Sequence, residues 1–271
     1  MEVYYALKIN SSDEILMALL TQFDFESYEE YEDYFIAYIQ KPKFDDEVRS
    51  EVEQLTTKYT TTYTIEEIQP QNWNAIWESS FQPVVVGEFC QVRADFHPPK
   101  EGVTHDLIIN PKMAFGTGHH ATTHMMIQQM EDIDFTNKTV FDFGCGTGIL
   151  AVLASKQRAH SVDAIDIEKE SYLSTIENAE VNGVFNVLVL EGDLDRAPDK
   201  KYDIILANIN RNILIKYAPQ LIAKLNAGGN LLVSGILEED ASSVEYEYVS
   251  FGLVKASQNV RDGWACIEFR A

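Results

Sequence analysis

Hydrophobic and polar positions follow two different patterns along the chain. In residues 1–70 they predict the order β-α-β-β-α-β, and the first helix has a capping pattern, Ser11-Ser12-Asp13-Glu14, ahead of the apolar Leu16 and Leu20. The predicted strands cover 3–9, 23–29, 34–39 and 61–68, and the predicted helices cover 15–20 and 44–55. This order is that of a small α+β, ferredoxin-like domain.

A break in the pattern follows at Gln69-Pro70-Gln71-Asn72. We therefore predict an N-terminal domain over 1–70, a linker over 71–82 and a second domain over 83–271. A short helix around Trp73–Trp77 is expected to bridge the two, and strands are expected over 84–92 and 106–109.

From Lys138 onward, apolar strands alternate with amphipathic helices. The predicted strands are 139–143, 161–166, 187–190, 202–208 and 230–234, and the predicted helices are 149–156, 172–181 and 213–225. Repeated βα units indicate a parallel sheet with helices on both faces. We expect Gly228-Gly229 to end the last helix, and 250–256 and 264–270 to form an antiparallel hairpin. The fold class is thus α/β, a Rossmann-like sheet that is mainly parallel and ends in a hairpin, as in methyltransferases rather than dinucleotide dehydrogenases.

Charge is distributed unevenly between these two parts. The chain has a formal net charge of −22, and residues 1–70 hold 16 acidic and 5 basic side chains, which is half of that charge in a quarter of the length. Such a field repels nucleic acid and attracts basic partners. The alternative is that the acidity only keeps the protein soluble.

Other features of composition bear on location. The apolar runs have strand length, Glu2, Asp13 and Glu14 interrupt the apolar residues at the start, and the three cysteines are dispersed without metal-ligand spacing. We therefore expect a cytoplasmic protein without a membrane span. Separately from these features, a monomer is expected.

A glycine loop follows the first strand of the second domain. Val140 to Gly148 reads as a buried strand that runs into Gly144, Gly146 and Gly148 and then into a helix. Ile149 occupies the position where a dinucleotide fingerprint has its third glycine, and Asp166 lies 22 residues after Gly144, at the end of the next strand. The pattern favours a nucleoside ligand held by Gly144, Gly146 and Asp166, although a glycine turn can serve the fold alone.

Two more polar residues end neighbouring strands. Asp193 follows the third strand, and Asn208 ends the fourth, where the carboxyl edge of a parallel sheet faces the ligand crevice. Asp193 is a candidate for contact with an adenine ring. Asn208 is a candidate site residue, with the alternative that it only caps the next helix.

A second loop rich in glycine precedes the first strand. The segment from Asn110 to Thr123 contains Gly116, Gly118 and paired histidines, His119 and His120, and it leads into a helix. A hydroxyl from Thr122 or Thr123 could donate to a ligand carboxylate. Without acidic or cysteine partners at ligand spacing, the histidines do not indicate a metal site. Cys145 has no local base that would make it a nucleophile.

Several of these segments together resemble the ribosomal protein L11 methyltransferase family, of the PrmA type. The resemblance runs from Trp73 to the C-terminus and is carried by Ala114-Phe115-Gly116-Thr117-Gly118 with Thr122-Thr123, by Asp142 to Ala151, by Ala207-Asn208-Ile209, by Ser234 to Leu237 and by Trp264. It implies S-adenosylmethionine as cofactor, contacted by Thr123, Gly144, Asp166 and Asn208. It also implies trimethylation of lysine ε-amines and an α-amine on ribosomal protein L11, a basic substrate gripped by the N-terminal domain.

One segment departs from that family pattern. Asn210-Arg211-Asn212 follows Ala-Asn-Ile, where the family usually has Leu or Val, and we expect a changed substrate rim. Asn208 is the candidate catalytic residue, orienting the acceptor amine. The alternatives are a methyltransferase for another protein or a small molecule, an RNA methyltransferase, which the charge disfavours, and a non-catalytic S-adenosylmethionine-binding module.

Overall fold

The computed structural model describes residues 3–68, 82–110 and 114–271. The chain forms two compact units, Met1–Ser80 and Phe81–Ala271. The border predicted at 69–72 and the bridging helix predicted around Trp73–Trp77 lie outside the described residues.

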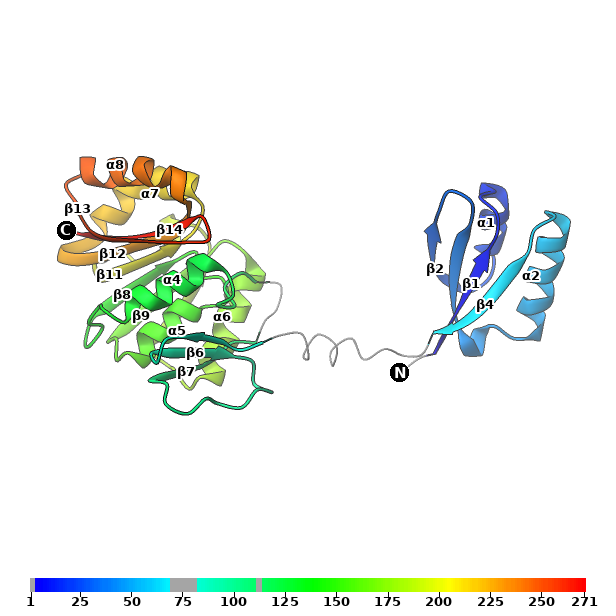
Figure 1. Cartoon of the computed structure of the whole chain (residues 1–271), viewed down its shortest axis with the longest axis horizontal. Coiled ribbons are helices and arrows are strands. Elements are labelled where there is room, and N and C mark those ends of the chain that lie inside the picture. The colour runs from blue at the N-terminus through cyan, green and yellow to red at the C-terminus, as the bar shows by residue number, and fades with distance from the viewer. Residues whose placement is uncertain (1–2, 69–81, 111–113) are drawn as a thin grey trace. The chain divides into compact units, whose positions relative to one another are not determined.

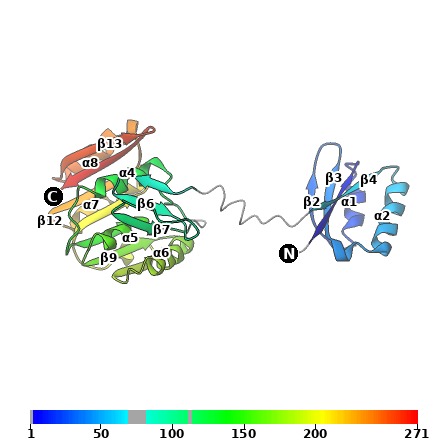
Figure 2. The ribbon, with the colours of Figure 1, turned by 60° about the horizontal axis from the view of Figure 1, so that its bottom comes forward.

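The N-terminal unit has one four-stranded antiparallel sheet with two helices on the same face (Figures 1 and 2). Its elements are β1 (Tyr4–Ile9), α1 (Glu14–Leu20), β2 (Phe25–Glu30), β3 (Phe35–Gln40), a short η1 (Lys41–Lys43), α2 (Asp46–Lys58) and β4 (Tyr63–Ile68), in sheet order β2-β3-β1-β4. Asp13 caps α1 by accepting from the N–H groups of Ile15 and Leu16, and Asp45 caps α2. The predicted ferredoxin-like order is confirmed.

The second unit is built on a seven-stranded sheet of order β10-β9-β8-β11-β12-β14-β13. The strands are β8 (Thr139–Phe143), β9 (Ser161–Asp166), β10 (Val187–Glu191), β11 (Tyr202–Asn208), β12 (Leu225–Leu237), β13 (Val254–Arg261) and β14 (Trp264–Arg270). The first five are parallel, and β14 is antiparallel to both β12 and β13. The mainly parallel sheet and its closing hairpin are as predicted.

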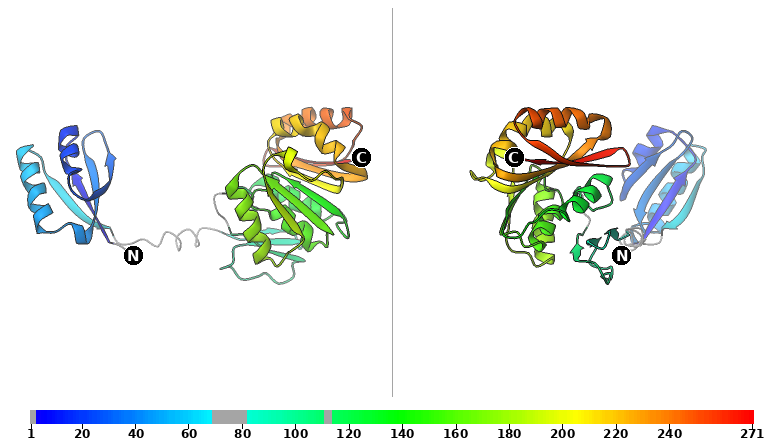
Figure 3. Two further views of the ribbon diagram at one scale, coloured as in Figure 1. Left: turned by 180° about the vertical axis from the view of Figure 1, so that it is seen from behind. Right: turned by 60° about the vertical axis from the view of Figure 1, so that its left-hand side comes forward.

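Helices cover both faces of this sheet (Figure 1). The helices are α4 (Ala121–Met130), α5 (Ile149–Lys156), α6 (Lys169–Val181), α7 (Arg211–Ala223) and α8 (Ala241–Ser250), with short turns η2 (Leu194–Arg196) and η3 (Glu238–Asp240). One apolar core unites α4, α5 and α6 with a small sheet of β5 (Val84–Val86), β6 (Cys90–Arg93) and β7 (His105–Ile108). A second core unites α7 and α8 on the opposite face. Figure 3 shows the hairpin, in red, beside α8. In the described ranges no helix is both long and apolar enough to cross a membrane.

Three element predictions were wrong in detail. Helix α7 ends at Ala223, and Leu225 and Gly228-Gly229 belong to β12, whose Leu225 pairs with Tyr202. Because Leu225 packs into the same core as α7, the apolar stripe continues past the end of the helix. The segment 84–92 is a hairpin of β5 and β6 that turns at Gly87, which has φ +56.

The C-terminal hairpin starts later than predicted. Strand β13 begins at Val254 instead of residue 250, because 241–250 form α8. The buried Ala241, Val244 and Tyr248 recur at three- and four-residue spacing along this helix, which gives it an apolar face.

Candidate functional site

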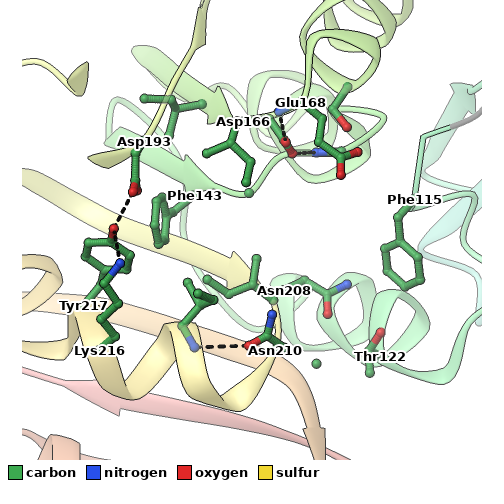
Figure 4. Close-up of a pocket in the computed structure, with 18 of the residues that line it drawn as sticks. Phe115, Thr122, Phe143, Asp166, Glu168, Asp193, Asn208, Asn210, Lys216 and Tyr217 are labelled. Atoms are coloured by element: carbon green, nitrogen blue, oxygen red, sulfur yellow. Dashed lines mark hydrogen bonds between the residues drawn. The ribbon is translucent and has the colours of Figure 1, made fainter. Parts of the chain in front are cut away.

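A pocket of about 640 Å³ lies at the carboxyl ends of the parallel strands of the second unit (Figure 4). Phe143 ends β8, Asp166 ends β9, Asn208 ends β11, and all three line the pocket. Apolar side chains such as Ile165, Ile209 and Ile213 form much of the remaining wall. An apolar cavity of this size with a few convergent polar groups is typical of a small-molecule site.

The glycine loop lets the backbone reach the floor of this pocket. Gly144 has φ +76, and a Cβ there would lie 2.3 Å from Cγ2 of Ile209. Gly146 has φ +56, and its Cβ would lie 2.3 Å from the carbonyl oxygen of Phe115. Any side chain would therefore both strain the backbone and displace a neighbouring wall of the pocket.

Hydrogen bonds join the glycine loop to the loop that precedes α4. The N–H of Thr147 donates to the carbonyl of Phe115 at 2.9 Å, and its hydroxyl donates to the carbonyl of Gly116. On the other side the buried Thr175 hydroxyl donates to the carbonyl of Gly146 at 2.9 Å. Both loops predicted from their glycines thus form one rigid corner of the site.

Asp166 lies where the sequence predicted, beside the glycine loop. One carboxylate oxygen accepts from the N–H of Gly146 at 2.8 Å, and the other accepts from the N–H of Glu168 at 3.0 Å. Each carboxylate oxygen has two acceptor sites, so the group keeps capacity for hydroxyl donors from a ligand.

Asn208 is fixed by a neighbour from α4. Its side-chain N–H donates to the hydroxyl of Thr123 at 3.2 Å, while its Oδ1 is buried and has no hydrogen-bond partner among the described residues. The capping alternative is wrong, because Asn210 caps α7 by accepting from the N–H of Ile213. Thr123 is fully buried behind Asn208, and it is Thr122 that lines the pocket.

The far end of the pocket holds a chain of polar groups that the sequence only partly indicated. Asp193 accepts from the N–H of Leu194 at 2.7 Å and from the hydroxyl of Tyr217, and Lys216 donates to that hydroxyl at 2.9 Å. The hydrogen bond from Tyr217 lowers the pKa of Asp193. In Figure 4 these groups lie at one side, Phe115 and Thr122 at the other, and Asn208 between them. Tyr217 was predicted only as part of the apolar stripe of α7.

Three rings form the wall near Thr122. The ring centre of His120 lies 4.8 Å from that of Trp264 and 5.4 Å from that of Phe115, and both contacts are edge to face. The His120 ring also accepts from the N–H of Thr122 and so caps α4, while His119 contacts the Thr117 hydroxyl and the carbonyl of Gln82. The histidine pair therefore has structural partners.

Comparison with known proteins decides the family. The family model of ribosomal protein L11 methyltransferase (PrmA) matches residues 7–271. The chain belongs to the ribosomal protein L11 methyltransferase family. Two curated members are similar across nearly the whole length of this chain. That of Bacteroides fragilis is 37% identical over 261 residues, 95% of this chain and 93% of the relative. That of Porphyromonas gingivalis is 38% identical over 270 residues, 97% and 92%.

Solved structures agree with this family. A ribosomal protein L11 methylase from Lactobacillus delbrueckii subsp. bulgaricus has a TM-score of 0.63 at 30% identity, covering 70% of this chain and 98% of its own. A methyltransferase from Pyrococcus furiosus has a TM-score of 0.50 at 16% identity, covering 60% and 88%, and shows the fold alone. The family match also extends through the N-terminal unit, beyond the region that carried the resemblance in the sequence.

Membership in the L11 methyltransferase family makes the protein an S-adenosylmethionine-dependent methyltransferase. The pocket fits that cofactor on its own features. Gly144 and Gly146 leave backbone where a Cβ would collide, Asp166 keeps acceptor capacity, and the buried Oδ1 of Asn208 has no partner in the part of the chain that the structure describes.

Two buried groups of the glycine motif take no part as nucleophiles. Cys145 contacts the Thr175 hydroxyl, and burial raises the pKa of its thiol well above the usual value. Asp142 is fully buried, and desolvation raises its pKa to about 7. These groups pack the loop.

Proposed function

We propose that the protein transfers methyl groups from S-adenosylmethionine to lysine ε-amines and to the N-terminal α-amine of ribosomal protein L11. The names of its curated relatives support L11 as the substrate. The observation that carries the catalytic part is Asn208, which lines the pocket beside the glycine loop and whose buried Oδ1 has no partner within the described ranges. Buried acceptors are rarely left unpaired unless a ligand or an ordered water supplies the donor.

The acceptor amine has to be neutral to attack a methyl group. A lysine has an unperturbed pKa of about 10.4, so only a small fraction is neutral near pH 7. The apolar wall of Phe143, Ile209 and Trp264 disfavours the charged form of an amine that enters. Oδ1 of Asn208 accepts a hydrogen bond from that amine and directs its lone pair. Cofactor binding supplies the electrophilic methyl group.

Alignment is the main contribution that we assign to the protein. Thr123 holds the amide of Asn208 in one orientation by accepting from its NH₂ group, which leaves Oδ1 buried and without a partner among the described residues. We assign the cofactor to Gly144, Gly146, Asp166 and Asn208, and we place Thr123 behind Asn208 as a positioning residue. Holding two reactants in line can supply several kcal/mol of the barrier reduction.

We assign substrate recognition to the N-terminal unit over about 1–70. In its sheet Leu7 and Ala37 are buried against the helices, so the alternate row of Ala6, Tyr38 and Glu66 faces away from them. No described element of this unit covers that outer row. Nζ of Lys8 on the same face lies 3.8 Å from the ring centre of Tyr34, a cation–π contact within the unit that supports affinity of such rings for ammonium groups. A surface of tyrosines and carboxylates suits a basic protein.

Net charge and the state of the cysteines bear on the location and partners of the protein. We infer that the protein is a cytoplasmic monomer. Its net charge of −22 favours contact with a basic protein over contact with nucleic acid. All three cysteines are buried and free, as a reducing compartment would keep them.

The test is to incubate the purified protein with S-adenosylmethionine and undermethylated ribosomal proteins and to measure intact masses. We expect successive methyl increments on L11 alone, with a rate that rises as pH approaches the pKa of the acceptor amine. Peptide mapping then assigns the methylated lysines and the α-amine. Cofactor binding without mass gain on any ribosomal protein would refute L11 as the substrate. No turnover of labelled cofactor with any acceptor would favour the non-catalytic alternative.

A further inference from the structure

A second cavity adjoins the cofactor pocket on its outer side. It is an open groove of about 630 Å³ between the start of α7, the end of β12 and η3. Asn210, Gly235 and Trp264 line both the groove and the pocket, so the two spaces meet at these residues. Its other walls include Arg211, Asn212 and Glu239.

A bulge in β12 lies at this junction. The pairing of β12 with β14 shifts register between Val233 and Ile236. Gly235 lies in this bulge with φ +85, and a Cβ there would lie 2.4 Å from the carbonyl oxygen of Ile209. The N–H of Ile209 in turn donates to the carbonyl of Ser234 at 3.1 Å. Gly235 therefore allows the backbones of β12 and Ile209 to approach closely where the two spaces meet, and any side chain there would disturb this approach.

The groove walls offer groups that suit a polypeptide. Arg211 is held by Asp240 at 2.6 Å and by Oδ1 of Asn212, which leaves the NH₂ group of Asn212 without a partner in the described part of the chain. Asn210 uses its Oδ1 to cap α7, and its NH₂ group is likewise unpaired there. Free amide donors of this kind bind backbone carbonyls.

The charge at the rim of the groove favours basic polypeptides. Glu238, Glu239 and Asp240 are consecutive on η3, and among the described residues the guanidinium of Arg211 pairs with Asp240 alone. Glu239 is exposed, with no ion pair in the described structure. The rim therefore has an excess of negative charge, which attracts lysine or arginine side chains and repels phosphates.

We propose that this groove binds the polypeptide segment that flanks the methylated amine, with Glu239 favouring a basic residue next to the target. The inference rests on the proposed function, because an amine on a protein substrate enters the pocket with its chain attached. That chain has to lie on the surface where the pocket opens. The sequence departure Asn210-Arg211-Asn212 thus gains a role as a specificity element of the substrate rim.

The test uses the full-length protein with ribosomal protein L11 as acceptor. We compare Glu239→Gln and Glu239→Lys with Glu180→Lys, a matched charge reversal at an exposed position of α6 that lines neither cavity. Steady-state methylation gives kcat and KM, calorimetry gives the Kd of S-adenosylmethionine, and thermal unfolding gives Tm. We expect KM for L11 to rise about threefold with Glu239→Gln and about tenfold with Glu239→Lys. The values of kcat and of the cofactor Kd should stay within about twofold of wild type, and Tm should not change.

The outcomes separate this inference from the function on which it rests. A wild-type enzyme that methylates L11 but whose KM responds equally to Glu239→Lys and Glu180→Lys would overturn the groove alone. Failure of the wild-type enzyme to methylate L11 would overturn the proposed function, and the groove's role with it. A fall in Tm or cofactor affinity with Glu239→Lys would show that the residue supports the fold, which also contradicts the inference.

Discussion

Two asparagines in the wall of the pocket, Asn208 and Asn210, perform different tasks. Asn210 accepts from the N–H of Ile213 and ends the loop at α7, whereas Asn208 donates to Thr123 and keeps a buried acceptor without a partner among the described residues. The sequence places both at or just after the end of a buried strand and does not distinguish a cap from a ligand group. The distinction depends on which partner lies within reach, and the partner of Asn208 is 85 residues away.

Replacing Asn208 tests its orienting role. Asn208→Ala should lower kcat for L11 about a hundredfold, since misdirection of a reactant by about 1 Å costs that much. The Kd of S-adenosylmethionine should change much less. Thr123→Val should lower kcat by roughly tenfold, because it frees the amide of Asn208 to rotate, and Thr123→Ser should restore it. Methylation assays with calorimetry of cofactor binding measure both effects. Equal losses of kcat and affinity in Asn208→Ala would refute the role.

The buried Asp142 predicts a dependence of stability on pH. One of its oxygens accepts from the N–H of Ala151 at 3.1 Å, the other has no partner among the described groups, and burial raises its pKa to about 7. Between about pH 4 and pH 7 the folded chain thus keeps a proton that the unfolded chain releases. The contribution of Asp142 to the free energy of unfolding therefore falls as pH rises through this window.

Asp142→Asn removes this titration. The difference in free energy of unfolding, variant minus wild type, should grow by about 1.4 kcal/mol for each pH unit between about pH 5 and pH 7. Urea denaturation at several pH values measures it. Asp134→Asn serves as control, because hydrogen bonds from Thr136 lower the pKa of that exposed carboxyl, and its difference should be flat in the same window. Parallel pH curves for wild type and Asp142→Asn would contradict the raised pKa.

At the scale of elements, the sequence was most informative where a segment has one clear period. Strands β8, β9 and β11 and helix α5 have the predicted bounds, because each is a buried apolar run or stripe ended by glycine or polar residues. The end of α7 was misjudged because the apolar pattern of the helix continues into β12. Helix α8 was missed because Tyr246 and Val249 are exposed apolar side chains that obscure its amphipathic pattern.

The site could be predicted in part for a similar reason. Gly144, Asp166 and Asn208 follow from the rule that ligands bind at the carboxyl ends of parallel strands, and all three line the pocket. Tyr217 and Lys216 could not be assigned from their helix alone, because only the fold places that turn of α7 opposite Asp193. The choice between Thr122 and Thr123 likewise depends on how α4 is rotated against β11.

The glycine loop offers a test at this scale. Gly146→Ala should weaken binding of S-adenosylmethionine at least about tenfold and lower Tm, because its Cβ would lie 2.3 Å from the carbonyl oxygen of Phe115, in backbone that cannot move without the adjoining loop. Gly228→Ala is the matched control: its φ of +75 is also positive, but a Cβ there meets nothing within 4 Å. It should cost only about 1–2 kcal/mol of backbone strain and leave cofactor affinity unchanged. Similar loss of affinity in both variants would mean that φ strain, and not the close contact, governs the loop.

At the scale of the whole molecule, the density of negative charge is highest in the N-terminal unit, whereas the pocket lies in the second unit. The cofactor pocket belongs to the second unit, whereas residues 1–70 carry a net charge of −11 with only 5 basic side chains. Glu239 at the groove adds negative charge close to the pocket. Such fields increase the rate of encounter with a basic protein more than they strengthen the final contacts, and they are screened by salt.

Salt should therefore act on the protein substrate and spare the cofactor. Between about 50 mM and 300 mM NaCl we expect KM for L11 to rise by roughly tenfold, because the Debye length shortens over this range and the attraction between exposed charges is screened. The Kd of S-adenosylmethionine should change less than about twofold, since its pocket is largely apolar. Methylation kinetics over a salt series, with calorimetry of the cofactor alongside, separates the two. A KM that stays constant with salt would mean that the acidity of this chain serves its solubility, and that L11 is recognised by apolar and hydrogen-bonding contacts instead.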